Sequence, residues 1–342
     1  MKLILQLLIL GLVTSVTAKA QTDSKDSVRT MSYTLNSNTV LVYSRPKSFE
    51  FITALPRDYE DFCKDVFRKD QLINIGLIAG STVLLVAYDQ AILDDAKKFG
   101  RTIHLSGTSN QKPIIDQKVT IAKKEIKLQF NIPTDLNSTF YYLGDGWTHT
   151  SIALAFWVSG LISKDYRSLR TASELGECIL STGIATQFIK HITGRESPYT
   201  TNVRGGVWRF FPNQKQYANH TPQYDAFPTG HLATAMATVT VIADNYPEKR
   251  YIRPVGYTLM GLLGFAMLNN GVHWAGDYPL GIAMGYVFAK VAVNHGRTIH
   301  ADHQSVALGN HWKFSPSLAL INNDVGMSMG IRWSIVRGYK QN

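Results

Sequence analysis

Apolar residues along the chain are grouped into six segments that have the length of helices. The first, residues 72–88, carries no charged residue and lies between Asp70 and Asp89. The other segments are 147–163, 179–189, 232–243, 254–272 and 278–289. Several are too short to cross a bilayer, and most contain Asn, Gln, Ser, Thr or His, which is typical of helices buried in a bundle. We therefore predict a mainly α fold, a helical bundle of about six core helices.

A membrane-embedded bundle is the alternative. Residues 72–88 and 254–272 are long enough to span a bilayer if the helices are tilted. The mean hydropathy of the chain is close to zero, which favours a bundle surrounded by water.

The C-terminal segment, residues 301–342, changes to a period of two. Apolar residues occupy every second position from 325 to 335, with small or polar residues between them, as in a half-buried strand. Leu318 and Leu320 alternate in the same way, before an Asn-Asn-Asp run that suits a tight turn. We predict a terminal β-hairpin that covers the bundle. Attachment to an outer-membrane partner is the second reading of this hairpin.

The N-terminus has the composition of a secretory signal peptide. Lys2 precedes an apolar run at 3–13, and small residues flank Lys19 at a cleavage-like site. The run is shorter than the ~20 residues of a membrane span, so removal of residues 1–20 is favoured over a retained anchor. The protein is then exported, and it is periplasmic or membrane-associated if the host is bacterial.

The remaining chain divides into three parts by composition. Residues 21–65 form an N-terminal leader and extension whose first part, 21–32, is polar. Residues 66–300 hold the helical domain, and 301–342 form the hairpin extension.

The charge and the cysteines restrict the partners. Loss of Lys2 and Lys19 with the signal peptide lowers the formal net charge from +10 to +8. This surplus favours anionic substrates or a membrane surface, and no nucleic-acid-binding motif accompanies it. The two cysteines, Cys63 and Cys178, form neither a disulfide framework nor a metal-ligand spacing, and their pairing is left open.

Three short segments carry the candidate chemistry: KHITGRESP at 190–198, PTGH at 228–231 and GVHWAGD at 271–277. His273 precedes Asp277 by four residues, so a helix would place the carboxylate beside the imidazole and orient it. Thr229, Gly230 and His231 precede a helical run, and free N–H groups at a helix N-terminus favour an anion.

The order and approximate spacing of these segments resemble the type 2 phosphatidic acid phosphatase and vanadium haloperoxidase superfamily, whose pattern is K-x6-RP, PSGH and SR-x5-H-x3-D. The resemblance covers residues 140–292. It implies that His273 is a nucleophile that becomes phosphorylated, that Asp277 orients it and that His231 is the general acid. It also implies phosphate contacts from Lys190, Arg195, Thr229 and Gly230, and it implies no metal and no cofactor.

The strongest anion contacts of that pattern are missing from this chain. The two family arginines are replaced by Ser197 and Met267, and each such contact is typically worth about 3 kcal/mol of transition-state stabilisation. Arg204 and Arg209, in the aromatic segment between the first two motifs, are candidates for compensating cations. The family often has an arginine at the position of Arg195, so this residue does not by itself replace the lost guanidinium.

Three functions follow from the resemblance. The first is an exported phosphatase that hydrolyses a phosphate monoester or a lipid (pyro)phosphate through a phosphohistidine intermediate. The second is a catalytically degenerate protein of the same fold that binds an anion or a lipid headgroup. The third is a vanadate-dependent haloperoxidase, which is less favoured because vanadate needs a dense ring of cations.

Overall fold

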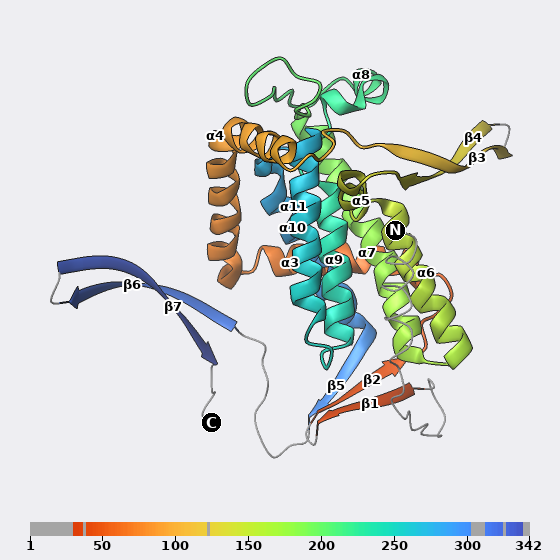
Figure 1. The fold of residues 1–342 in the computed structure, drawn as a ribbon. Coiled ribbons are helices and arrows are strands. Elements are labelled where there is room, and N and C mark those ends of the chain that lie inside the picture. Colours follow the sequence, from red (N-terminus) through yellow and green to blue (C-terminus); the bar gives the residue numbers. More distant parts are fainter. Residues whose placement is uncertain (1–29, 37–38, 122–123, 302–311, 324–325, 338–342) are drawn as a thin grey trace.

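The computed structural model describes residues 30–36, 39–121, 124–301, 312–323 and 326–337. The predicted signal peptide, 1–20, lies outside the described residues. The fold is mainly α, as predicted, and each of the six predicted segments lies in a helix (Figure 1). These helices are α4 (Leu72–Thr102), α6 (Gly146–Ser163), α7 (Tyr166–Thr193), α9 (Gly230–Asn245), α10 (Ile252–Asn270) and α11 (Tyr278–Gly296).

Helix α7 is longer than its apolar segment because its first half buries charged residues. Asp165 caps the helix by accepting hydrogen bonds from the next turn. The guanidinium of Arg167 pairs with Glu248, and that of Arg170 pairs with Glu50, both at 2.7 Å. Hydropathy alone predicts a solvent-exposed segment here, whereas these ion pairs allow the charged turns to be buried.

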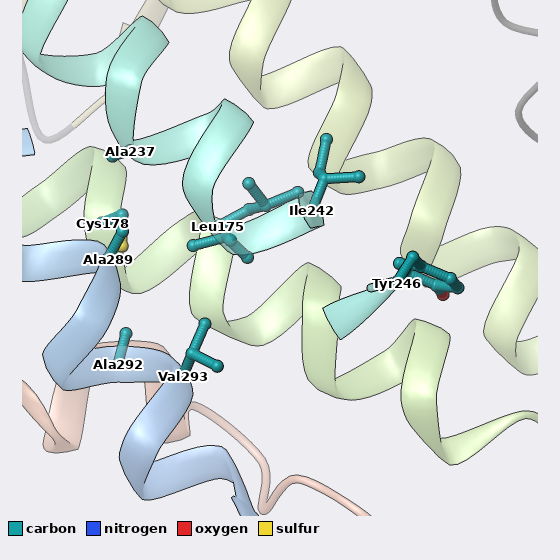
Figure 2. Close-up of a cluster of buried hydrophobic side chains, with 9 residues drawn as sticks. Leu175, Cys178, Ala237, Ile242, Tyr246, Ala289, Ala292 and Val293 are labelled. Carbon is teal, nitrogen blue, oxygen red and sulfur yellow. The ribbon is translucent and has the colours of Figure 1, made fainter. Parts of the chain in front are cut away.

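The largest buried cluster is formed by α7, α9 and α11, which pack side by side. Figure 2 shows its side chains, which come from all three helices and include Tyr246 just after α9. One of them is Cys178, and both it and the exposed Cys63 are free thiols. Small residues allow α9 and α11 to approach closely, since a Cβ placed on Gly285 would lie 2.0 Å from the carbonyl oxygen of Ala233.

The N-terminal extension is more structured than its composition predicts. It contains β1 (Thr30–Asn36), β2 (Thr39–Ser44), α2 (Glu50–Thr53) and α3 (Leu55–Val66). The polar leader predicted at 21–32 therefore gives way to a strand at Thr30. The strand β5 (Arg297–Ala301) pairs antiparallel with β2, so the sheet order is β1-β2-β5 and the sheet joins the extension to the end of α11.

Two further hairpins are present. The strands β6 (Trp312–Asn323) and β7 (Gly326–Arg337) pair antiparallel, which confirms the predicted C-terminal hairpin. The strands β3 (Gln111–Ile121) and β4 (Lys124–Pro133) form a hairpin that the sequence analysis did not predict, and it projects from the bundle in Figure 1. The short elements η1 (Lys69–Gln71), α5 (Leu136–Tyr142), α8 (Gln214–Asn219), η2 (Thr221–Gln223) and η3 (Ala275–Asp277) connect the longer helices.

Helix α4 is apolar and exposed. Within the described part of the chain, the helical stretch Lys69–Thr102 is long and apolar enough to cross a membrane, and its apolar window is not buried in the protein. Its exposed side chains include Ile73, Leu77 and Val83.

Candidate functional site

The three motifs lie at helix ends that meet at one end of the bundle. Lys190 is in the last turn of α7, and His231 is in the first turn of α9. His273 lies in the turn between α10 and η3, and Asp277 is the last residue of η3. The imidazole rings of His231 and His273 are 5.8 Å apart between centroids. The structure therefore brings together the two histidines that the sequence analysis selected.

The tautomer of His273 follows from its hydrogen bonds. Its Nδ1 lies 2.7 Å from the carbonyl oxygen of Ala226 and 3.4 Å from Oδ2 of Asp277. Both oxygens only accept hydrogen bonds, so Nδ1 carries the proton and Nε2 has the free lone pair. The ring is almost fully buried, which limits its motion. In the neutral ring, this arrangement leaves the lone pair of Nε2 available to a ligand.

Asp277 accepts hydrogen bonds from residues of two motifs, 228–231 and 271–277. Its Oδ2 accepts a hydrogen bond from the Trp274 N–H at 2.8 Å, and its carbonyl oxygen accepts one from the Thr229 N–H at 3.1 Å. The sequence analysis expected His273 and Asp277 on one helical face. The contact is present, but the 3-10 turn η3 makes it rather than an α-helix.

A second aspartate, Asp89 of α4, completes the support of this turn. One Arg195 nitrogen donates to Asp277 Oδ1 at 2.6 Å, and another donates to Asp89 Oδ2 at 2.5 Å. Asp89 Oδ1 also accepts the Gly276 N–H at 2.7 Å. All three charged side chains are fully buried. The sequence analysis missed Asp89, which belongs to no motif and is brought to the site only by the packing of α4.

The position of Arg195 corrects its predicted role. Its guanidinium lies between the rings of Trp208 and Trp274, at 4.6 and 5.3 Å from their centroids, and the residue has no exposed surface. With two carboxylates and two aromatic faces around it, it is not available to an incoming phosphate. Arg195 instead fixes Asp277, and through Asp277 the ring of His273.

Thr229 and Met267, two departures from the superfamily pattern, contact each other. The Thr229 hydroxyl donates to Met267 Sδ at 3.7 Å and caps α9 by accepting from the Leu232 N–H. Both residues are fully buried, and Met267 packs in an apolar cluster with Leu232 and Leu263. The Thr229 side chain therefore faces the core, and the anion contacts that remain at this helix end are the backbone N–H groups, including that of the partly exposed Gly230.

His231 has no hydrogen-bond partner among the described residues, and its ring packs against that of Tyr141 at 5.0 Å between centroids. Burial, with the neighbouring His273 and Lys190, lowers the pKa of His231 to about 3. The ring is therefore neutral near pH 7 until an anion is bound. A bound phosphate would raise this pKa, because a negative charge stabilises the imidazolium.

Lys190 is paired with a carboxylate that the sequence analysis did not select. Its Nζ lies 3.7 Å from Asp225 Oδ2, and the Lys190 side chain is buried whereas Asp225 is partly exposed. Burial lowers the pKa of Lys190, and the charges of Asp225 and Asp277 oppose that shift. An incoming phosphate would have to share this ammonium with Asp225.

The predicted compensating cations lie outside this cluster of contacts. Arg209 donates to the Gln223 carbonyl oxygen and lies 3.5 Å from Glu196, and Arg204 is exposed. Ser197, which replaces a family arginine, is buried. Lys97 of α4 is a cation that the sequence analysis missed: its Nζ lies 3.1 Å from the place that a Cβ on Gly271 would occupy.

A protein-family model matches part of the helical domain. Residues 171–299 match the model of the PAP2 superfamily, and the resemblance drawn from the motifs is confirmed. The match covers less than half of the chain.

One solved structure with partial similarity is that of the first transmembrane PAP2-type phosphatidylglycerolphosphate phosphatase from Bacillus subtilis. The two sequences are 12% identical, the match covers 64% of this chain and 93% of that chain, and the TM-score is 0.36. No curated protein matches the sequence.

Proposed function

We propose that the protein is an exported phosphatase that hydrolyses a phosphate monoester or a lipid (pyro)phosphate through a phosphohistidine at His273. The observation that carries the proposal is the hydrogen bond from His273 Nδ1 to the Ala226 carbonyl oxygen, which leaves Nε2 unprotonated. The match of residues 171–299 to the model of the PAP2 superfamily supports the same reaction class.

The reaction has two steps. In the first, His273 Nε2 attacks phosphorus, the bond from phosphorus to the ester oxygen breaks, and His231 gives its proton to that oxygen. In the second, water attacks the phosphohistidine, His231 takes a proton from the water, and inorganic phosphate leaves. Asp277 stabilises the positive charge that develops on the His273 ring, as the carboxylate does in other oriented imidazoles.

The positive charge around the phosphate comes from fewer groups than in the superfamily pattern. Lys190 is the first, and the backbone N–H groups at the start of α9 are the second. Lys97 is our candidate for the third, because its ammonium lies beside Gly271, two residues before His273. Lys97 forms no ion pair with any of the described residues. Lys97 thus replaces Arg204 and Arg209 as the preferred compensating cation.

The second candidate function is anion or lipid-headgroup binding without turnover. It is favoured by the burial of both Ser197 and Met267 where the superfamily has arginines, and by the engagement of Arg195 with two carboxylates. Such a protein would keep the fold and lose the charge stabilisation that phosphoryl transfer needs.

The exposed apolar side chains of α4 and the basic charge of the chain suit contact with a lipid surface, which would make a lipid phosphate accessible to the site. We include this contact in the proposal, with a phosphorylated small molecule as the alternative substrate.

The test is phosphate release by the purified protein from p-nitrophenyl phosphate and from a short-chain phosphatidate. Wild type, His273→Ala and the matched control His220→Ala, which changes an exposed histidine, are compared. We expect turnover in wild type and His220→Ala and background rates in His273→Ala. Equal background rates in all three proteins would favour the binding function.

A further inference from the structure

A group of titratable side chains lies far from the site already described. It consists of Asp58 on α3, Glu177 on α7 and His295 on α11, and we call it the distal cluster. Glu177 precedes Lys190 by 13 residues on one helix, which is about 20 Å at 1.5 Å per residue. His295 follows Asp277 by 18 residues, or about 27 Å. The distal cluster therefore lies about 20 Å or more along the helices from the candidate site.

The ligand atoms of the distal cluster converge. One nitrogen or oxygen from each of the three residues lies within 4.8 Å of the others. Asp58 is 2% exposed and Glu177 is 5% exposed, and the His295 side chain is 21% exposed. His295 Nδ1 lies 3.2 Å from Asp58 Oδ1, and its Nε2 lies 2.9 Å from Asp61 Oδ2. The three residues come from three different helices.

Two oxygens of the distal cluster lack partners. Asp58 Oδ2 and Glu177 Oε1 are buried and have no hydrogen bond among the described residues. Burying a polar oxygen without a partner costs about 1–3 kcal/mol, and more if the carboxylate is charged. Besides His295, the described basic side chain that pairs with Asp58 is Arg57, whose Nε is 3.9 Å from the other Asp58 oxygen and whose side chain is half exposed. Two buried carboxylates in contact need either a shared proton or a cation between them.

We propose that the distal cluster binds one divalent first-row transition ion through Asp58, Glu177 and His295. An imidazole nitrogen with carboxylate oxygens is a donor set that suits Zn²⁺ or Mn²⁺, whereas Mg²⁺ and Ca²⁺ prefer oxygen ligands alone. Asp61 contacts Nε2 of His295 and orients the imidazole. Carboxylates that hydrogen-bond to metal-binding histidines have the same role in metal sites. The ion joins α3, in the N-terminal extension, to two core helices, so its role is structural.

The test uses EDTA-treated, purified protein titrated with ZnCl₂ and with MnCl₂ by calorimetry, together with the melting temperature at each metal concentration. Four further proteins are compared: Glu177→Gln, Asp58→Asn, the matched control Glu60→Gln on the exposed face of α3, and His273→Ala. The variant His273→Ala shows whether metal binds at the histidines of the candidate site instead of at the distal cluster. Because the readout is binding and stability, failure of the proposed phosphatase activity would leave this test intact.

We expect one ion per chain and a melting temperature that rises with metal concentration. Glu177→Gln and Asp58→Asn should each weaken binding by at least about tenfold, and Glu60→Gln and His273→Ala should bind as wild type does. The proposal is overturned by binding that is lost in His273→Ala alone. It is equally overturned if no ion binds and Glu177→Gln raises the melting temperature, which would identify a carboxyl pair that shares a proton.

Discussion

Single residues explain how the site differs from the superfamily pattern. Met267 stands where the pattern has an arginine, and it accepts a hydrogen bond from Thr229, which stands where the pattern has a serine. A threonine methyl and a thioether can both be buried in the apolar cluster, whereas a guanidinium placed there would lose its hydration. The two replacements therefore pack against each other, and a bound anion would lack the contact that the arginine makes in the superfamily pattern.

The pairing of Lys190 with Asp225 leads to a prediction about substrate binding. A carboxylate beside the site repels an incoming phosphate by a few kcal/mol at a separation of ~6–8 Å and an effective dielectric constant near 20. Asp225→Asn should therefore lower KM for p-nitrophenyl phosphate by about tenfold at pH 6. The control is Asp65→Asn, which removes an exposed carboxylate on α3. A KM that rises in Asp225→Asn would show that Asp225 positions Lys190 instead of competing with the phosphate.

The lowered pKa of His231 leads to a prediction about pH. The general acid must be protonated in the free enzyme for kcat/KM, and burial lowers its pKa to about 3. On the alkaline side, kcat/KM should therefore fall as the pH rises above about 3. The bound phosphate raises this pKa, so the fall in kcat should occur at higher pH than the fall in kcat/KM.

The comparison protein for this measurement is His231→Asn. The substrate phosphate titrates in the same way in both assays, so any difference between the two pH profiles comes from the enzyme. We expect the variant to lose the fall in kcat/KM that the deprotonation of His231 causes in wild type. Identical profiles in the two proteins would exclude His231 as the general acid.

At the scale of elements, a close backbone contact lies between α9 and α11, and it depends on two glycines of α11. A Cβ on Gly281 would lie 2.5 Å from the Thr229 carbonyl oxygen, in the second motif itself. The same helix pair therefore builds the core and sets the distance between the second and third motifs.

Gly285→Ala should destabilise the protein, because its Cβ would overlap the Ala233 carbonyl oxygen and force the two helices apart. We expect a loss of about 1–3 kcal/mol in the free energy of unfolding, measured by urea denaturation. Gly261→Ala in α10 is the matched control, since a Cβ there meets nothing within 4 Å. It should be neutral or stabilising by up to about 1 kcal/mol. Equal effects of the two substitutions would contradict the close contact.

The elements also show what periodicity can predict. The apolar segments predict six helices, of which α4 is exposed rather than buried in the core, and the alternation at the C-terminus predicts the hairpin β6–β7. The sheet β1-β2-β5 was not predicted, because β2 pairs with a strand more than 250 residues further along the chain and no local pattern reports that pairing. The first half of α7 was missed because its buried charges resemble a solvent-exposed surface.

At the scale of the whole molecule, the candidate site depends on chain outside the superfamily segment 171–299. The motifs predicted His231, His273, Asp277 and Lys190, since each belongs to a short pattern with a known spacing. Asp89 and Lys97 belong to α4 and could not be found in this way, because only the packing of that helix brings them near η3 and Gly271. The same packing explains why Arg195, selected as a phosphate contact, is a positioning residue.

The most direct test of the account is to trap the phosphorylated enzyme. Protein is mixed with ³²P-labelled p-nitrophenyl phosphate, quenched in alkali, where a phosphorus–nitrogen bond survives, and digested to locate the label. Wild type and His220→Ala should carry acid-labile label on the peptide that contains His273, and His273→Ala should carry none. Turnover without label in wild type, or label that persists in His273→Ala, would contradict the phosphohistidine mechanism.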